Sequence, residues 1–351
     1  MFKSLLAAIF NAVVRVRLWL YKSGLKKTHR LEKPVVSIGN ITLGGTGKTP
    51  FTIYLCRILE SEGHSPAVLS RGYRGTGENS NLLISDGRDI LSPPEVSGDE
   101  PRLIAESLPG IPVAIGGRRH ASARIISGNP ALDTSIFVLD DGFQHIQLHR
   151  DINLVLVDAT SPFGGGKLVP AGILREPLES LSRADALIVT RSHLKPEKRE
   201  VIREELSHYA PSIPIFFYCH RITGFRPVRP GGNSLKTDGA TKGAPPGDKA
   251  FLLAAIGNPI QFTRDLEMLN LDIRGKILMR DHHAYDEKDL AGITDEFRLS
   301  GADFIVTTEK DAVRLRGLEI DRLPLFAAVQ EIYSDEEIRF REWLSDRLTH
   351  L

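Results

Sequence analysis

The fold is decided by the stretch VVSIGNITLGGTGKTP, residues 35–50. Its first residues are mostly β-branched, which predicts a buried strand, and from residue 48 onward a helical pattern runs to near Gly63. A glycine-rich turn between a buried strand and a helix is the usual context of a phosphate-binding loop. The first glycine of that motif is replaced by Thr42, so a glycine-rich surface turn is the alternative. The flanking strand and helix favour the phosphate-binding loop.

Each residue type in this loop has a physical role in binding ATP. Glycines let the backbone amides surround the phosphates, Lys48 can reach the β- and γ-phosphates, and the Thr49 hydroxyl can ligate Mg²⁺. Lys48 is also a predicted catalytic residue, because phosphoryl transfer depends on charge neutralisation. The predicted nucleotide-binding residues are Gly44, Gly45, Thr46, Gly47, Lys48, Thr49 and Pro50.

Short apolar runs alternate with helical patterns on both sides of this loop. The runs lie at 34–38, 66–69, 111–115, 136–139, 152–157 and 186–189. Such alternation is typical of an α/β fold in which helices flank a parallel sheet. We therefore predict a P-loop NTPase domain over residues 31–225.

The composition changes at residues 226–249, where Pro, Gly, Ser, Thr and Lys dominate, and this indicates a linker. Beyond it, apolar runs at 251–256, 276–278, 304–306 and 323–326 predict strands, with helices that begin near Gln261, Asp286 and Ser334. Residues 250–351 are therefore predicted to form a second, smaller α/β domain. The segment 231–247 indicates no function.

Residues 1–30 hold a local excess of positive charge, because no acid precedes Glu32. On a helical wheel one stripe is apolar and consists of Phe2, Leu5, Leu6, Ile9, Val13, Val16 and Leu20. The uncharged run 4–14 is shorter than the roughly 20 residues that span a bilayer, so we expect an amphipathic helix that lies on a membrane. A secretory signal is disfavoured, because no small-residue cleavage site follows. A helix whose stripe packs on the domain core is the other alternative.

The composition excludes several classes of protein. The 351 residues are 41% hydrophobic and 25% charged with a net charge of +1, which is typical of a globular protein. The basic residues do not form a stripe, so we expect no nucleic-acid partner. Cys56 and Cys219 match no metal-binding or disulfide pattern, which indicates a reducing, cytoplasmic setting.

Two acidic strings can lie near the phosphates. Asp140 and Asp141 follow the apolar run 135–139, where the Walker B acid of a P-loop protein is expected, and can hold Mg²⁺. Asp99 and Glu100 lie in a Gly-Asp-Glu-Pro string after a loop. A strand-end cap for the first string and a solvated turn for the second are the alternatives. The predicted magnesium ligands are Thr49, Asp140, Asp141 and Glu100.

Taken together, these strings resemble the tetraacyldisaccharide 4'-kinases, which phosphorylate the lipid A precursor at the Gram-negative inner membrane. The resemblance covers nearly the whole chain. It rests on nine strings in family order: GN at 39–40, GGTGKTP at 44–50, SRGYRG at 70–75, GDEP at 98–101, DDGFQH at 140–145, VPAGILREP at 169–177, GNP at 257–259, DHH at 281–283 and TTEKD at 307–311. The same family carries the departure at Thr42.

The resemblance implies transfer of the ATP γ-phosphoryl to the 4'-hydroxyl of a tetraacylated glucosamine disaccharide 1-phosphate, giving lipid IVA. It implies that Asp99 is the base for the acceptor hydroxyl and that His282 is its partner. It also places the protein on the cytoplasmic face of the inner membrane, with the lipid surface as a partner. Candidates for the acceptor's phosphate and sugar are Arg71, Tyr73, Arg74, Gln144, His145 and Arg175.

Several alternatives stay open. Structural salt bridges are the alternative role for the arginines. A membrane-associated ATPase switch without a metabolite acceptor is the rival function. Because Asp99 and His282 lie on opposite sides of the predicted linker, we expect domain closure to bring them together. The sequence does not assign roles to Lys310 or Asp311.

Overall fold

The apolar runs of residues 31–225 become strands of one sheet, because each run is short, β-branched and separated by helices. A computed structural model describes residues 2–231 and 243–351. Over these residues the first sheet has eight strands in the order β3-β4-β2-β5-β1-β6-β7-β8, and β3 alone is antiparallel to its neighbour. The strands are β1 (Val35–Asn40), β2 (Pro66–Ser70), β3 (Leu82–Ser85), β4 (Val113–Ile115), β5 (Ile136–Leu139), β6 (Ile152–Asp158), β7 (Ala186–Thr190) and β8 (Ile215–Phe217).

Helices cover both faces of this sheet. Neighbouring residues of β1 show the alternation, because Val36 packs in the core beneath α2, α4 and α10, whereas Val35 packs in the core beneath α5. Helix α6 covers a third core on the β6 to β8 side. The helices are α2 (Lys48–Ser61), α3 (Pro94–Ser97), α4 (Asp99–Ser107), α5 (Arg119–Ser127), α6 (Arg199–Tyr209) and α10 (Glu337–Thr349), with short 3₁₀ turns η1 (Leu178–Arg183), η2 (Ser192–Leu194) and η3 (Pro196–Lys198).

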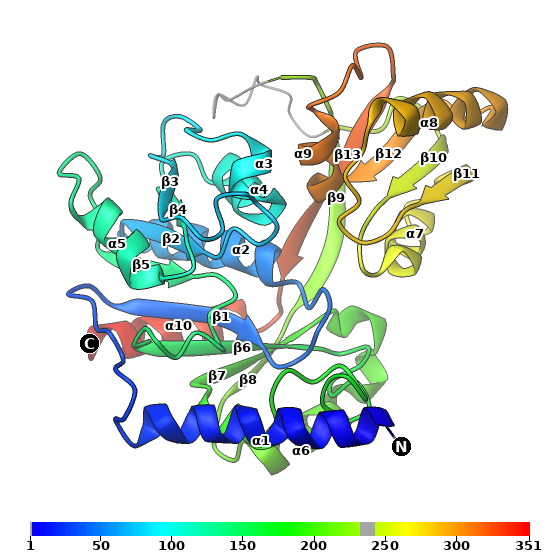
Figure 1. The fold of residues 1–351 in the computed structure, drawn as a ribbon. Coiled ribbons are helices and arrows are strands. Elements are labelled where there is room, and N and C mark those ends of the chain that lie inside the picture. The colour runs from blue at the N-terminus through cyan, green and yellow to red at the C-terminus, as the bar shows by residue number, and fades with distance from the viewer. Residues whose placement is uncertain (1, 232–242) are drawn as a thin grey trace.

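The second sheet is smaller and stands beside the first (Figure 1). Its order within the described residues is β11-β10-β12-β13-β9, and the long strands β9 and β13 pair antiparallel at one edge. The strands are β9 (Cys219–Pro227), β10 (Lys249–Ala254), β11 (Asp272–Leu278), β12 (Phe304–Thr308) and β13 (Leu325–Tyr333), and the helices are α7 (Pro259–Glu267), α8 (Glu287–Ser300) and α9 (Glu309–Leu315). This arrangement confirms the predicted α/β class with a second, smaller α/β unit.

The two sheets divide at a different place from the predicted linker. Strand β8 ends the first sheet at Phe217 and β9 begins the second at Cys219, whereas the linker was predicted over residues 226–249. Strand β9 carries charged and glycine residues that do not alternate, so its sequence gave no strand signal. Residues 232–242 of the predicted linker lie outside the described residues. In addition, α10 returns from the second unit and buries Phe340 and Leu344 in the core of the first sheet.

Helix α1 (Phe2–Lys22) runs along the outside of the first unit (Figure 1). No residue of this helix is buried, and six of the seven stripe residues are exposed, including Phe2 at 73% and Leu5 at 61%. Arg17 donates to the carbonyl oxygen of Gln144 at 2.9 Å, which ties the helix to the loop after β5. Because the stripe is exposed, the alternative in which it packs into the core is wrong. By length and composition alone the helix could cross a membrane.

Candidate active site

The loop between β1 and α2 has the geometry of a phosphate-binding loop. Gly47 has φ 84°, a left-handed conformation, and a Cβ there would lie 2.8 Å from Cε1 of His220, so the position requires glycine. The Asn40 amide donates to Oγ1 of Thr46 at 2.9 Å, and the Thr190 hydroxyl donates to the Thr46 carbonyl oxygen at 2.9 Å. The loop is therefore held from two strands.

The residue that departs from the usual motif has a structural explanation. Thr42 is buried and forms an isolated antiparallel bridge with Leu174, flanked by a hydrogen bond from Leu43 N to the Ile173 carbonyl oxygen at 2.7 Å. Paired, extended backbone suits a β-branched residue and does not need glycine. The departure therefore leaves the loop intact.

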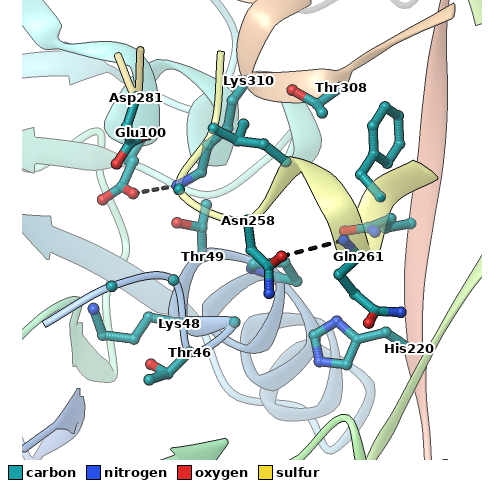
Figure 2. A pocket seen from close by; sticks show the side chains of 18 of the residues that line it. Thr46, Lys48, Thr49, Glu100, His220, Asn258, Gln261, Asp281, Thr308 and Lys310 are labelled. Atoms are coloured by element: carbon teal, nitrogen blue, oxygen red, sulfur yellow. Dashed lines mark hydrogen bonds and ion pairs between the residues drawn. The ribbon is translucent and has the colours of Figure 1, made fainter. Parts of the chain in front are cut away.

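The loop opens into a cavity of about 590 Å³ between the two sheets. All seven predicted nucleotide-binding residues line it, and side chains of α7, β13 and the start of α9 face them from the second unit. Figure 2 shows Lys48 and Thr49 from α2, with Asn258, Gln261 and Lys310 approaching from the opposite side. A phosphate bound on the loop would therefore be enclosed by both units.

Asp141 is the acid in contact with the loop lysine. Its Oδ1 lies 3.5 Å from Nζ of Lys48 and accepts from Nη1 of Arg175 at 2.9 Å. Burial alone would raise the pKa of Asp141, but the charges of Lys48 and Arg175 outweigh it and hold that pKa far below its usual value. Asp141 is therefore a carboxylate inside the cavity.

Asp140 has a different environment from its neighbour. It is 1% exposed, its Oδ1 accepts from the Thr52 hydroxyl at 3.0 Å, and its Oδ2 accepts from the Ser70 hydroxyl at 2.9 Å. Burial, with the charges of Glu100 and Asp141, raises the pKa of Asp140 to about 6. Asp140 does not line the cavity, whereas Asp141 does. Magnesium binding by Asp140 stays a prediction.

The residues at this point fit a magnesium ion that shares its ligands with phosphate. Thr49, Glu100 and Asp141 line the same cavity, and the charge of Asp141 acts directly on Glu100. Among the described residues no three acidic, histidine or cysteine side chains form a metal cage. Mg²⁺ commonly takes one or two carboxylates and completes its shell with water and phosphate oxygens, so this oxygen set is suitable.

Asp99 and His282 are in contact across the two units. Nδ1 of His282 lies 3.2 Å from Oδ2 of Asp99, although α4 carries the aspartate and the loop after β11 carries the histidine. Nε of Arg314 donates to the same oxygen at 2.7 Å. The pair is therefore already in contact in this structure, across the interface of the two units. That domain closure brings it together stays a prediction.

Arg314 helps to keep Asp99 ionised. Burial alone would raise the pKa of Asp99, but the hydrogen bond from His282 and the charge of Arg314 lower it below its usual value. Arg314 also donates to Oδ1 of Asp311 at 2.8 Å and to the Ala255 carbonyl oxygen at 3.2 Å. Asp311 is therefore a buried anchor for the arginine that supports Asp99.

The predicted acceptor-binding residues separate into two groups. Arg71, Tyr73, Arg74 and Arg175 line the cavity, and the Tyr73 ring meets His282 edge to face at 6.1 Å. Arg74 donates to the Asp281 carbonyl oxygen at 3.3 Å, which connects the loop after β2 to the histidine loop.

Gln144 and His145 do not line this cavity. The chain turns after Asp141, where φ is 49°, buries Phe143 in the core and directs Gln144 to donate to the Asn40 carbonyl oxygen at 2.9 Å. Burial and neighbouring arginines lower the pKa of His145 to about 3. Acceptor binding by these two residues stays a prediction.

The sequence analysis did not predict a set of polar side chains that lies at the α7 end of the cavity. His193 follows β7, His220 lies in β9, and both line the cavity near α7. In α7, Gln261 donates to Oδ1 of Asp265 at 2.7 Å. Nε2 of His220 has no hydrogen-bond partner within the described chain, and burial lowers the pKa of His220 to about 3. No motif marks these side chains, because they meet only where the two sheets face each other.

Comparison with known sequences gives one consistent result. The sequence model of the tetraacyldisaccharide-1-P 4'-kinases matches residues 2–349. The tetraacyldisaccharide 4'-kinase of Desulfatibacillum aliphaticivorans is 37% identical over 346 residues, which cover 98% of this chain and 91% of the relative. The enzyme of the same name from Pelobacter propionicus is 39% identical over 316 residues, covering 89% and 82%.

A solved structure agrees with the sequence comparisons. The "apo" form of LpxK from Aquifex aeolicus, crystallised in complex with ATP, superposes with a TM-score of 0.78 at 26% identity. The match covers 98% of this chain and 97% of that one, so both units and α1 are included. With a full-length family match, relatives above 30% identity and a shared fold, this chain belongs to the tetraacyldisaccharide 4'-kinase family.

Proposed function

We propose that this protein transfers the γ-phosphoryl group of ATP to the 4'-hydroxyl of a tetraacylated glucosamine disaccharide 1-phosphate, giving lipid IVA in lipid A biosynthesis. The observation that carries the proposal is one cavity shared by the phosphate-binding loop and by His282 of the Asp99–His282 pair. A nucleotide switch needs the loop, but it does not need a histidine in the same cavity that is hydrogen-bonded to an acid. The pair therefore favours transfer to a hydroxyl over hydrolysis alone.

The strand order supports one direction for the bound nucleotide. Strands β5 and β2 lie on one side of β1 and carry Asp141 and the Arg71–Arg74 loop, whereas β6 and β7 lie on the other. Since the acids and the acceptor pair are on the β5 side, the γ-phosphoryl points that way. The ribose and base of ATP then extend toward His220 and Gln261.

The transfer step relies on positioning and charge neutralisation. Loop amides and Lys48 hold the β- and γ-phosphates. Mg²⁺, held by Thr49, Glu100 and Asp141, neutralises phosphate charge when bound. The proton of the 4'-hydroxyl passes to the Asp99–His282 pair, which is joined by a 3.2 Å contact. Arg71, Arg74 and Arg175 bind the acceptor's sugar and phosphate, and Tyr73 packs on its apolar edge.

Helix α1 supplies the membrane contact in this proposal. Its exposed apolar stripe and its basic residues suit the boundary between lipid headgroups and acyl chains. The acceptor is a lipid, so an anchored enzyme meets it at the surface. We infer a peripheral or monotopic protein on the cytoplasmic face of the Gram-negative inner membrane.

The test is phosphorylation of the lipid itself. Purified protein with ATP, Mg²⁺ and the tetraacyl disaccharide 1-phosphate in detergent micelles should convert the disaccharide to a species heavier by one phosphoryl group, measured by mass spectrometry. An acceptor that lacks the 4'-hydroxyl should give no product. ATP hydrolysis at the same rate with or without acceptor, and no heavier lipid, would support the switch function instead.

A further inference from the structure

Helices α4 and α9 face each other across the two units and are joined by a row of ion pairs. Lys310 pairs with Glu100, Arg314 pairs with Asp99 at 2.7 Å, and Arg316, just after α9, pairs with Glu106 at 2.6 Å. Glu106 also pairs with Arg102 of its own helix at 2.7 Å. Three cations of the second unit therefore meet three acids of the first.

The three pairs differ in what they face. Lys310 and Glu100 both line the nucleotide cavity, whereas Arg316 and Glu106 do not. Figure 2 shows the Lys310 side chain reaching from α9 to the Glu100 carboxylate above the Lys48 side of the loop. Its side chain is 27% exposed, and that exposure opens onto the cavity. An ion pair that only joined the two units would not need to lie in the cavity that holds the phosphate-binding loop.

Two ammonium groups approach the cavity from opposite sides at this point. Lys48 lies 3.5 Å from Asp141, Lys310 pairs with Glu100, and all four residues line the cavity. Asp281, which immediately precedes His282, lines the cavity near Glu100 (Figure 2), so Lys310 lies toward the acceptor end of the nucleotide site.

We propose that Lys310 is a second phosphate-binding cation, supplied by the second unit, which binds the γ-phosphoryl group opposite Lys48. The inference rests on the proposed function and adds a residue to it. Before ATP binds, Glu100 positions the Lys310 ammonium group through their ion pair. When ATP is bound, the ammonium group contacts the γ-phosphoryl oxygens instead. A cation opposite the loop lysine neutralises charge on the group in transfer and joins the two units around it.

Binding of ATP relative to ADP tests this without any turnover. A non-hydrolysable ATP analogue and ADP, each with Mg²⁺ and without acceptor, are titrated into the wild-type protein, Lys310→Met and the matched control Arg316→Met. Lys310→Met should weaken the ATP analogue by about tenfold or more and leave ADP nearly unchanged, because a charged hydrogen bond to the γ-phosphoryl is lost. Arg316→Met removes an inter-unit pair outside the cavity and should change neither affinity.

Equal weakening of both nucleotides by Lys310→Met, or no weakening of either, would overturn the proposal, since an inter-unit pair makes no distinction between ATP and ADP. Thermal melts check that each variant is folded. If the methionine variant does not fold, it is replaced by Lys310→Gln, whose amide can still donate to Glu100. The expected result is the same: weaker binding of the ATP analogue and nearly unchanged binding of ADP.

Single-turnover transfer gives the second measurement. The rate with Lys310→Met should fall about 100-fold, as for other single donors to a transition-state oxyanion, and Lys310→Arg should recover part of it because it keeps the charge. A wild-type rate in Lys310→Met would also contradict the inference. The proposed function fails separately, because it is wrong if the wild-type protein yields no phosphorylated lipid.

Discussion

The two sides of the active-site cavity are built by different kinds of contact. On the side of the first sheet, the loop before α2 is shaped by backbone geometry, with Gly47 left-handed and Thr46 bonded to two strands. On the side of the second sheet, His282 and Arg314 act through side chains that cross to Asp99 of α4. The phosphate-binding loop is therefore shaped within one unit, whereas the acid–histidine pair depends on how the two units are joined.

The largest effect should come from the first-sheet side. Lys48→Ala removes the loop cation next to Asp141 and should lower phosphoryl transfer by about 1,000-fold or more, because the transferred group loses its main fixed charge. The measurement is the initial rate of lipid phosphorylation at saturating ATP, with a thermal melt as the folding control. Near-normal turnover would show that this loop is not the nucleotide site.

The Asp99–His282 pair tests the side of the second sheet. Asp99→Ala and His282→Ala should each slow the chemical step by roughly 100-fold or more and change ATP affinity much less. The double variant should be little slower than the slower single variant, because the two residues act as one unit. Single-turnover kinetics on the four proteins measures this.

The outcome that contradicts the pair is additivity. If His282 only supports the loop after β11, its loss should lower the melting temperature and multiply with the Asp99 defect. Tyr73, whose ring meets the His282 ring edge to face, offers a control: Tyr73→Phe keeps the ring and should leave the coupling between the pair unchanged.

The same contrast explains how much the sequence could predict. The phosphate-binding loop, six of the eight strands of the first sheet and Asp141 at the end of β5 are local features that residue spacing located, whereas β3 and β8 were not predicted. Strand β9 and the return of α10 to the first sheet depend on distant partners, and their own residues carry no signal for either.

The site follows the same rule. Asp99 and His282 were predicted through a family resemblance, but Arg314 between them was not, because an arginine in a short helix usually indicates a surface salt bridge. Asp99 lies 183 positions from His282 and 215 positions from Arg314 in the sequence, and periodicity cannot detect contacts over such separations. Asp140 was expected beside Asp141 at the metal, and its burial became apparent only when Ser70 and Thr52 were seen to enclose it.

The free energy of unfolding should depend more on the buried ion pairs of Arg314 than on the more exposed pair of Arg316 with Glu106. Arg314→Met leaves Asp99 and the fully buried Asp311 without their guanidinium, and should destabilise the protein by about 3 kcal/mol or more. Arg316→Met should cost about 1 kcal/mol or less, because Glu106 keeps its contact with Arg102. Thermal unfolding of both variants measures the difference, and equal melting temperatures would mean that Arg314 is not the centre of the interface.

The smallest effect on the site should come from removing α1. Since no residue of Phe2–Lys22 is buried, a chain without it should keep both sheets folded and bind ATP with unchanged affinity, while moving from the membrane fraction into solution. Fractionation and nucleotide titration measure the two properties separately. Ile9→Asp, in the exposed stripe, should also release the protein, whereas Ser4→Asp, on the opposite face, should release it much less. A truncated chain that aggregates and no longer binds ATP would show that α1 supports the fold. The nucleotide site and the membrane helix would then not be independent.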